Sequence, residues 1–255
     1  MATIDGGQID CRKAVGRIAN LAEALHESPL AGSVGISHTR WATHGGVTRE
    51  NAHPHFDQSG KMALVHNGVI ENYQALRVQL EERGHLFLSQ TDTEVLAHLI
   101  GQEFDRLEEP TKGGMITAIR LALKQVIGTY GIAIAHADLP GWIFGARRGS
   151  PLVLGIGKDQ HFLASDVSAL VNHTRDVVYL NDYEIAALQR EAFEITSLAG
   201  NGVGYSVSKV EFTAEDVSKG DYPHYMLKEI FEQPRSIEDA MRGRLSFDEG
   251  TAKLG

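Results

Sequence analysis

The run YGIAIAHA at residues 130–137 is followed by GWIFGARR at 141–148, SPLVLGIG at 150–157 and HFLASD at 161–166. Two more runs, DVVYLNDYEIAALQ at 176–189 and FEITSL at 193–198, complete the series. Short apolar runs separated by turn signals are typical of β-strands. Strands spaced this closely favour antiparallel hairpins, because a parallel crossover needs a dozen or more residues. The second half of the chain is therefore predicted to be β-rich.

The first half combines two short strand-like runs, at 31–37 and 61–66, with segments of helical periodicity. Thr91 and Glu94 have the spacing of a capping box before one of these segments, and Gly84 and Gly128 follow two others. The expected helices lie at 17–27, 71–83, 95–104 and 115–127. Helices grouped before a run of antiparallel strands predict an α+β fold in packed layers.

Composition excludes several classes of protein. The chain has 255 residues, a net charge of −9 and a pI near 5.7, which argues against nucleic-acid or anionic-membrane binding. No run is long and apolar enough for a membrane span. The single cysteine, Cys11, excludes a disulfide framework and fits a reducing compartment, so we expect a cytoplasmic protein.

The end of the chain differs from the rest. Residues 213–224 are polar and aperiodic, and residues 224–245 have helical character that we expect Pro234 to interrupt. We therefore predict one domain over residues 1–212, followed over 213–255 by a linker and the start of a connector to a further domain.

Residues 38–68 hold the densest polar cluster, HTRWATHGG at 38–46, NAHPH at 51–55 and VHNG at 65–68. One interpretation is a metal site, because imidazole is a common zinc ligand and His53 and His55 lie two apart. This hypothesis is disfavoured, because no HExxH helix and no carboxylate at ligand spacing stands nearby. We predict that the site holds no metal.

The other interpretation is a pocket for a small polar ligand. Arg40 can clamp a carboxylate, Trp41 can shield it and Asp92 can hold an ammonium group, which together suit an α-amino acid. Asn67 and Gly68 after a strand can direct amide hydrogens to one point, as in an oxyanion hole. The residues alone leave simpler explanations open, since Asn-Gly often forms a turn and Asp92 suits a helix N-cap.

The motifs occur together and in order in one family. HTRWATHG, NAHPH, VHNGVIENY, TDTE, YGIAIA, ARRGSPLVLG, ASD and HYMLKEIFEQP resemble the glutaminase domain of the glutamine–fructose-6-phosphate aminotransferases, which are type 2 glutamine amidotransferases. The resemblance extends over nearly the whole chain. Other amidotransferases, such as amidophosphoribosyltransferase and asparagine synthetase, are similar around the Arg, Asn-Gly and Ser/Thr-Asp elements, but match ATHG and HYMLKEIFEQP less well.

The resemblance implies an N-terminal nucleophile hydrolase-like, four-layer αββα sandwich. It implies that Arg40 binds the carboxylate of L-glutamine and that Asp92 binds its α-amine. Thr43 and His44 would line the pocket, and Trp41 would belong to a loop that closes over it. Asn67 and Gly68 would form the oxyanion hole. The remaining histidines of the cluster, His38, His53, His55 and His66, are expected to be structural hydrogen-bonding groups.

The family's nucleophile is a cysteine at the first position of the mature chain, and its free α-amine acts as the general base. This sequence begins Met1-Ala2-Thr3, and Cys11 is internal, without an adjacent free amine. We therefore expect the sequence to lack the first strand and helix of the sandwich, and we expect this polypeptide not to hydrolyse glutamine. A missing central strand would also lower stability and favour aggregation.

The reaction implied for the complete protein converts fructose 6-phosphate and glutamine to glucosamine 6-phosphate and glutamate, with no cofactor. Fructose 6-phosphate would bind a separate domain, and the resemblance suggests a homodimer. Three alternatives remain at this stage. They are another class 2 amidotransferase, a non-catalytic glutamine-binding module and a histidine-based metalloprotein.

Overall fold

The computed structural model describes residues 1–107, 109–211, 218–241, 245–246 and 251–252. The chain divides into two units, Met1–Glu211 and Phe212–Gly255. The first unit holds every predicted site residue. None of the helices in the described residues is long and apolar enough to cross a membrane.

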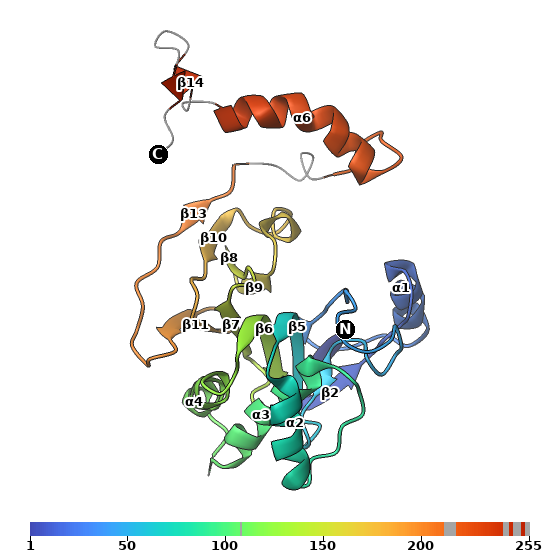
Figure 1. Ribbon diagram of the computed structural model, residues 1–255, viewed down its shortest axis with the longest axis vertical. Helices are drawn as coiled ribbons and strands as arrows, with labels where there is room; N and C mark the ends of the chain where they lie inside the picture. Colours follow the sequence, from blue (N-terminus) through green and yellow to red (C-terminus); the bar gives the residue numbers. More distant parts are fainter. Residues whose placement is uncertain (108, 212–217, 242–244, 247–250, 253–255) are drawn as a thin grey trace. The chain divides into compact units, whose positions relative to one another are not determined.

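The centre of the first unit is an antiparallel six-stranded sheet with the order β12-β11-β7-β6-β5-β4 (Figure 1). Its longest pair, β5 and β6, is in register from Met62 opposite His136 to Ile70 opposite Gly128. The strands are β4 (His55–Phe56), β5 (Met62–Ile70), β6 (Gly128–His136), β7 (Ile143–Arg148), β11 (Glu184–Leu188) and β12 (Phe193–Ser197).

One face of this sheet is covered by three helices (Figure 1). They are α2 (Tyr73–Glu82), α3 (Asp92–Asp105) and α4 (Lys112–Leu123). Met62 and Leu64 of β5 and Ile185 of β11 point into the same core as the helices' apolar stripes. The three helices were predicted from periodicity, and Gly84 ends α2 with a φ of 90°. α4 begins before the expected residue 115, because Thr111 caps it by accepting from the Gly114 amide at 3.0 Å.

The opposite face of the sheet packs against two smaller antiparallel sheets. Successive residues of a strand point to opposite faces. Ala63 and Val65 accordingly contact the sheet β2-β1-β3, and Ala186 and Leu188 contact the sheet β13-β10-β8-β9. The strands are β1 (Ala2–Asp5), β2 (Gln8–Cys11), β3 (Val34–Ile36), β8 (Val153–Gly157), β9 (Gln160–Ala164), β10 (Asp176–Tyr179) and β13 (Ser208–Lys209).

These elements form a helical layer, a sheet layer and a second sheet layer made of two parts. The predicted α+β sandwich is confirmed, but the described residues of the first unit do not form the second helical layer of the expected four-layer αββα arrangement. Among the described residues, β3 and β9 are edge strands of their sheets. Both line one cavity of about 640 Å³. A further helix, α1 (Ile18–Glu27), was predicted from its spacing and has no buried residue.

The second unit contains helix α6 (Tyr225–Met241) and the strand pair β14 (Leu245–Ser246) and β15 (Thr251–Ala252). The prediction that Pro234 interrupts the helix was wrong, because α6 continues through it. Proline removes one backbone N–H donor, and α6 runs on to Met241 despite that loss. Residues 213–217 of the predicted linker lie outside the described residues.

Candidate active site

Every predicted site residue borders one small cavity of about 100 Å³. Three segments supply them: the loop after β3, the second half of β5 and the first turn of α3. The predicted residues at the cavity are Arg40, Trp41, Thr43, His44, Asn67, Gly68 and Asp92. The structure therefore brings together groups as far apart in sequence as Arg40 and Asp92.

Asp92 is the buried anion of this cavity. It is the first residue of α3, where the helix dipole stabilises negative charge. One oxygen, Oδ2, accepts from the Ile70 amide at 2.9 Å, and Oδ1 lies 3.7 Å from His44 Nδ1. The N-cap is Thr91, whose hydroxyl accepts from the Glu94 amide at 3.2 Å. The alternative that Asp92 is an N-cap was therefore wrong.

Arg40 is the cation of the cavity, and in this structure its guanidinium closes a turn. Nη1 donates to the Gly46 carbonyl at 2.8 Å, and Nη2 donates to the carbonyl of His44. Burial lowers the pKa of Arg40, and the nearby Asp92 carboxylate opposes that shift. Binding a ligand carboxylate in bidentate fashion would require the guanidinium to exchange these carbonyls for the ligand.

The loop that carries Trp41 leaves one side of the cavity open. Trp41 is 89% exposed, so it borders the cavity without covering it. Thr43 is exposed, and its hydroxyl lies 3.2 Å from His44 Nδ1. The His44 ring packs edge-on to Tyr73 at 4.8 Å.

Asn67 and Gly68 lie consecutively on β5, opposite Gly131 and Tyr130 of β6. Gly68 has a φ of 133°, and a Cβ there would meet the Thr129 carbonyl oxygen at 2.2 Å. Only glycine therefore fits this position. The Asn67 Oδ1 atom lies 2.8 Å from His38 Nε2, and Asn67 Nδ2 has no hydrogen-bond partner among the described residues. An amide donor is thus available at this point.

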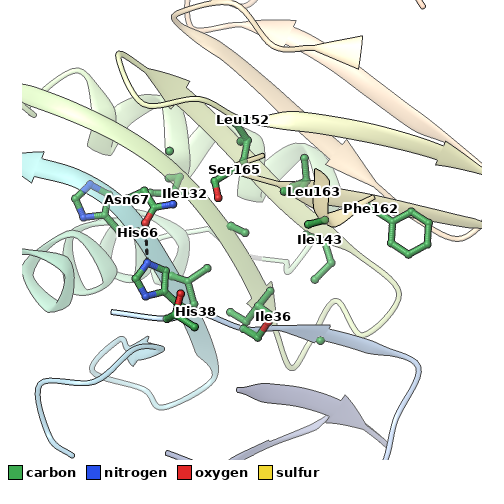
Figure 2. A pocket seen from close by; sticks show the side chains of 18 of the residues that line it. Ile36, His38, His66, Asn67, Ile132, Ile143, Leu152, Phe162, Leu163 and Ser165 are labelled. Atoms are coloured by element: carbon green, nitrogen blue, oxygen red, sulfur yellow. Dashed lines mark hydrogen bonds between the residues drawn. The ribbon is translucent and has the colours of Figure 1, made fainter. Parts of the chain in front are cut away.

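Asn67 also borders the larger cavity of about 640 Å³ (Figure 2). The walls of this larger cavity are mainly apolar. Ile36 from β3 and Leu163 from β9 lie on two sides of it, and Val65 belongs to the six-stranded sheet. His38, His66 and Asn67 line both cavities. The two cavities therefore meet at the Asn67 side chain.

The histidines of the cluster are buried or half-buried and hydrogen-bonded. Burial lowers the pKa of His38, His53 and His66, and it lowers the pKa of His55 to about 3. No group of three or more possible metal ligands occurs in the part of the chain that the structure describes. Sequence reasoning missed Thr93, whose hydroxyl contacts both His53 and His66, because both contacts join residues far apart in sequence.

Cys11 lies away from both cavities. It is half-buried on the outer strand β2, packs beside Ile4 and Ile36, and lines neither the large nor the small cavity. Burial raises its pKa, which opposes the thiolate form that a nucleophile needs.

Two packed layers of antiparallel sheet, with Arg40, Asp92 and the Asn67–Gly68 step at one pocket, agree with the class that comparison with known proteins gives, the glutamine amidotransferases. A solved structure of this class, the glutamine phosphoribosylpyrophosphate amidotransferase of B. subtilis, matches with a TM-score of 0.63 and 28% identity, over 79% of this chain and 43% of that chain. The model of the glutamine amidotransferase domain family matches residues 24–196. The chain belongs to this family.

Two curated relatives with higher sequence identity carry the same name. The chain is 50% identical over 243 residues to a glutamine–fructose-6-phosphate aminotransferase (isomerizing) of Thermus thermophilus. This alignment covers 95% of the present chain and 39% of the relative. It is 45% identical over 251 residues to the enzyme of that name from Bacteroides thetaiotaomicron, over 98% of this chain and 40% of the relative. The chain thus spans about two fifths of the length of these relatives.

Proposed function

We propose that this chain is the glutamine-binding and amide-hydrolysing part of a glutamine–fructose-6-phosphate aminotransferase. The observation that carries the proposal is the convergence of Arg40, Asp92 and the Asn67–Gly68 step on one cavity. A free amino acid offers one carboxylate and one ammonium group, and the side chain of glutamine adds an amide carbonyl that becomes an oxyanion during hydrolysis. The relatives' names support the same substrate.

In the proposed complex, Asp92 binds the α-ammonium group of L-glutamine through Oδ1, which faces His44 in the free chain. Arg40 binds the α-carboxylate after releasing the carbonyls of its turn. Thr43 and His44 line the pocket, and Trp41 moves from its exposed position to cover the ligand. The side-chain amide of glutamine then lies at Asn67, where the two cavities meet.

At that position, Asn67 Nδ2 and the Gly68 N–H donate to the carbonyl oxygen as it gains negative charge. The thiolate of the family's cysteine, a role that Cys11 does not fill, would approach from the larger cavity and attack the carbonyl carbon. The proton removed from that thiol would pass to the amide nitrogen, so that ammonia leaves and a thioester remains. Water would then cleave the thioester to glutamate and the free thiol. In the complete protein, the ammonia would convert fructose 6-phosphate to glucosamine 6-phosphate in a separate domain. The protein would act as a cytoplasmic homodimer without a cofactor.

A polypeptide of residues 1–255 alone is proposed to bind glutamine without hydrolysing it. Its only cysteine, Cys11, borders neither cavity. The same observation favours a second candidate function for such a polypeptide, a non-catalytic glutamine-binding module. Measuring glutamate release separately from glutamine binding shows which of these two steps the polypeptide carries out.

The test is calorimetric titration of this polypeptide with L-glutamine, comparing Asp92→Asn with the wild type. Loss of a charged hydrogen bond of about 1.5–3 kcal/mol should weaken binding about tenfold to a hundredfold. Asp138→Asn is the matched control, because Asp138 is at the surface and pairs with Lys61 at 3.1 Å. Equal affinity for both variants would contradict the proposed role of Asp92.

A further inference from the structure

A chain of hydrogen bonds connects Asn67 to the interior of the protein. We call it the histidine relay, and its members are His38, His53, Thr93 and His66. It ends at two acceptors, Asn67 Oδ1 and the Thr129 carbonyl. The successive contacts are Asn67 Oδ1 to His38 Nε2 at 2.8 Å, His38 Nδ1 to His53 Nδ1 at 2.7 Å, His53 Nε2 to Thr93 Oγ1 at 2.9 Å, Thr93 Oγ1 to His66 Nδ1 at 3.1 Å and His66 Nε2 to the Thr129 oxygen at 3.2 Å.

Counting protons along the relay exposes a constraint. Five contacts need five protons, and both end groups only accept. A neutral imidazole carries one N–H and a hydroxyl carries one O–H, so the three neutral histidines and Thr93 supply four. Either one histidine carries an extra proton, or the Asn67 amide turns over and its Nδ2 donates to His38 instead.

We propose that the histidine relay is a positioning element that couples one proton to the orientation of the Asn67 side-chain amide. With the extra proton, His38 donates to Oδ1 and Nδ2 faces the small pocket. Without it, the amide is reversed and the acceptor Oδ1 faces the pocket. The second orientation repels a developing oxyanion, so in the proposed function the proton determines whether the oxyanion hole is formed.

The extra proton belongs on His66. His66 Nδ1 lies 3.9 Å from Asp92 Oδ2, which favours an imidazolium there. Both His66 nitrogens then donate, Thr93 donates to His53, His53 donates to His38, and His38 donates to Asn67. Every contact is satisfied in this arrangement.

The electrostatic surroundings set the direction of the pH effect. Burial lowers the pKa of His66 below its usual range, and Asp92 opposes that shift. The other titratable or charged groups that act on the relay are His44, His55, Arg40 and the Met1 amine. All of these disfavour a positive charge, so the donor-presenting orientation in the free polypeptide is expected on the acid side of pH 6.5.

The relay can be tested by NMR of the 255-residue polypeptide labelled with ¹⁵N on histidine rings and asparagine amides. We expect the Asn67 amide signals, identified by their loss in Asn67→Ala, to shift with the same pH midpoint as the His66 ring. In Thr93→Val, His66 should still titrate while the Asn67 amide no longer follows. Thr129→Val is the matched control, because it keeps the carbonyl that ends the relay.

His38→Phe interrupts the relay at its other end and should give the same loss of coupling, so the test does not depend on one buried substitution. An Asn67 amide that stays constant while His66 titrates would overturn the proposal. Two further results would overturn it. One is an Asn67 amide that still follows His66 in Thr93→Val, and the other is a His66 ring that titrates in neither the wild type nor Thr93→Val. The effect of the relay on the oxyanion hole rests on the proposed function. The NMR titration uses no glutamine, so the relay and the proposed function can fail independently of each other.

Discussion

The two cavities that meet at Asn67 differ in how they are built. The small one, about 100 Å³, is bordered by polar groups from residues 38–93. The large one, about 640 Å³, has mainly apolar walls and lies between the edge strands β3 and β9. Recognition of a small charged ligand therefore depends on one compact stretch of chain. The side from which a nucleophile would approach is instead shaped by strands from distant parts of the sequence.

The largest expected effect concerns the strand shared by both cavities. Gly68→Ala places a Cβ 2.2 Å from the Thr129 oxygen at a φ of 133°. Backbone strain and separation of β5 from β6 should lower the free energy of unfolding by about 3 kcal/mol or more. Urea denaturation measures this loss in the free energy of unfolding. Gly60→Ala is the control, because Gly60 also has a positive φ but has open space where a Cβ would lie. Equal losses for the two variants would mean that the close approach at Gly68 is unimportant.

A smaller effect concerns the buried histidines behind the small pocket. His55 is buried, and its pKa is lowered to about 3 in the folded chain against about 6.5 when unfolded. As the pH falls below 6.5, the His55 imidazole is protonated in the unfolded chain but not in the folded one. The free energy of unfolding therefore decreases as the pH falls. His55 alone should account for about 2 kcal/mol between pH 7 and pH 5.

Chemical denaturation of His55→Gln across this range should show a shallower pH dependence than the wild type. His26→Gln is the control, because His26 is exposed on α1. A pH profile unchanged by His55→Gln would show that this burial does not govern acid sensitivity.

The smallest effect tests the apolar cavity. Leu163 is half-buried on β9 and lines that cavity, so Leu163→Lys should cost about 1 kcal/mol of stability. It should also reduce self-association of the 255-residue polypeptide, because a charge on an edge strand blocks pairing between chains. Sedimentation velocity measures this, with Leu121→Lys on α4 as control for added charge. If both variants self-associate like the wild type, the free edges do not drive association.

The sequence predicted individual helices better than it predicted the pairing of strands. Helices α2 and α3 follow from local signals, the glycine after Glu82–Arg83 and the Thr91 cap, which act within a few residues. Strand β3 was predicted within residues 31–37, but strand β1 and the pairing of β1 with β3 were not, because the pairing joins segments about thirty residues apart.

The site shows the same division. The proposed ligand-binding residues at the small cavity were predicted from their motifs and from the family resemblance, whereas Thr93 and the histidine relay were not. Its contacts join residues as far apart as His66 and Thr129, and they depend on how β5, β6, α3 and the loop after β3 pack together. Spacing in a sequence does not encode such packing.

The central claim is that the small cavity holds both charged ends of one amino acid. The most direct measurement is calorimetric titration of the 255-residue polypeptide with L-glutamine, with glutaramic acid, which lacks the α-amine, and with 4-aminobutanamide, which lacks the α-carboxylate. We expect saturable 1:1 binding of glutamine, at least about tenfold weaker binding of each analogue, and no release of glutamate. A folded polypeptide that binds no glutamine, or binds all three compounds equally, would contradict the account.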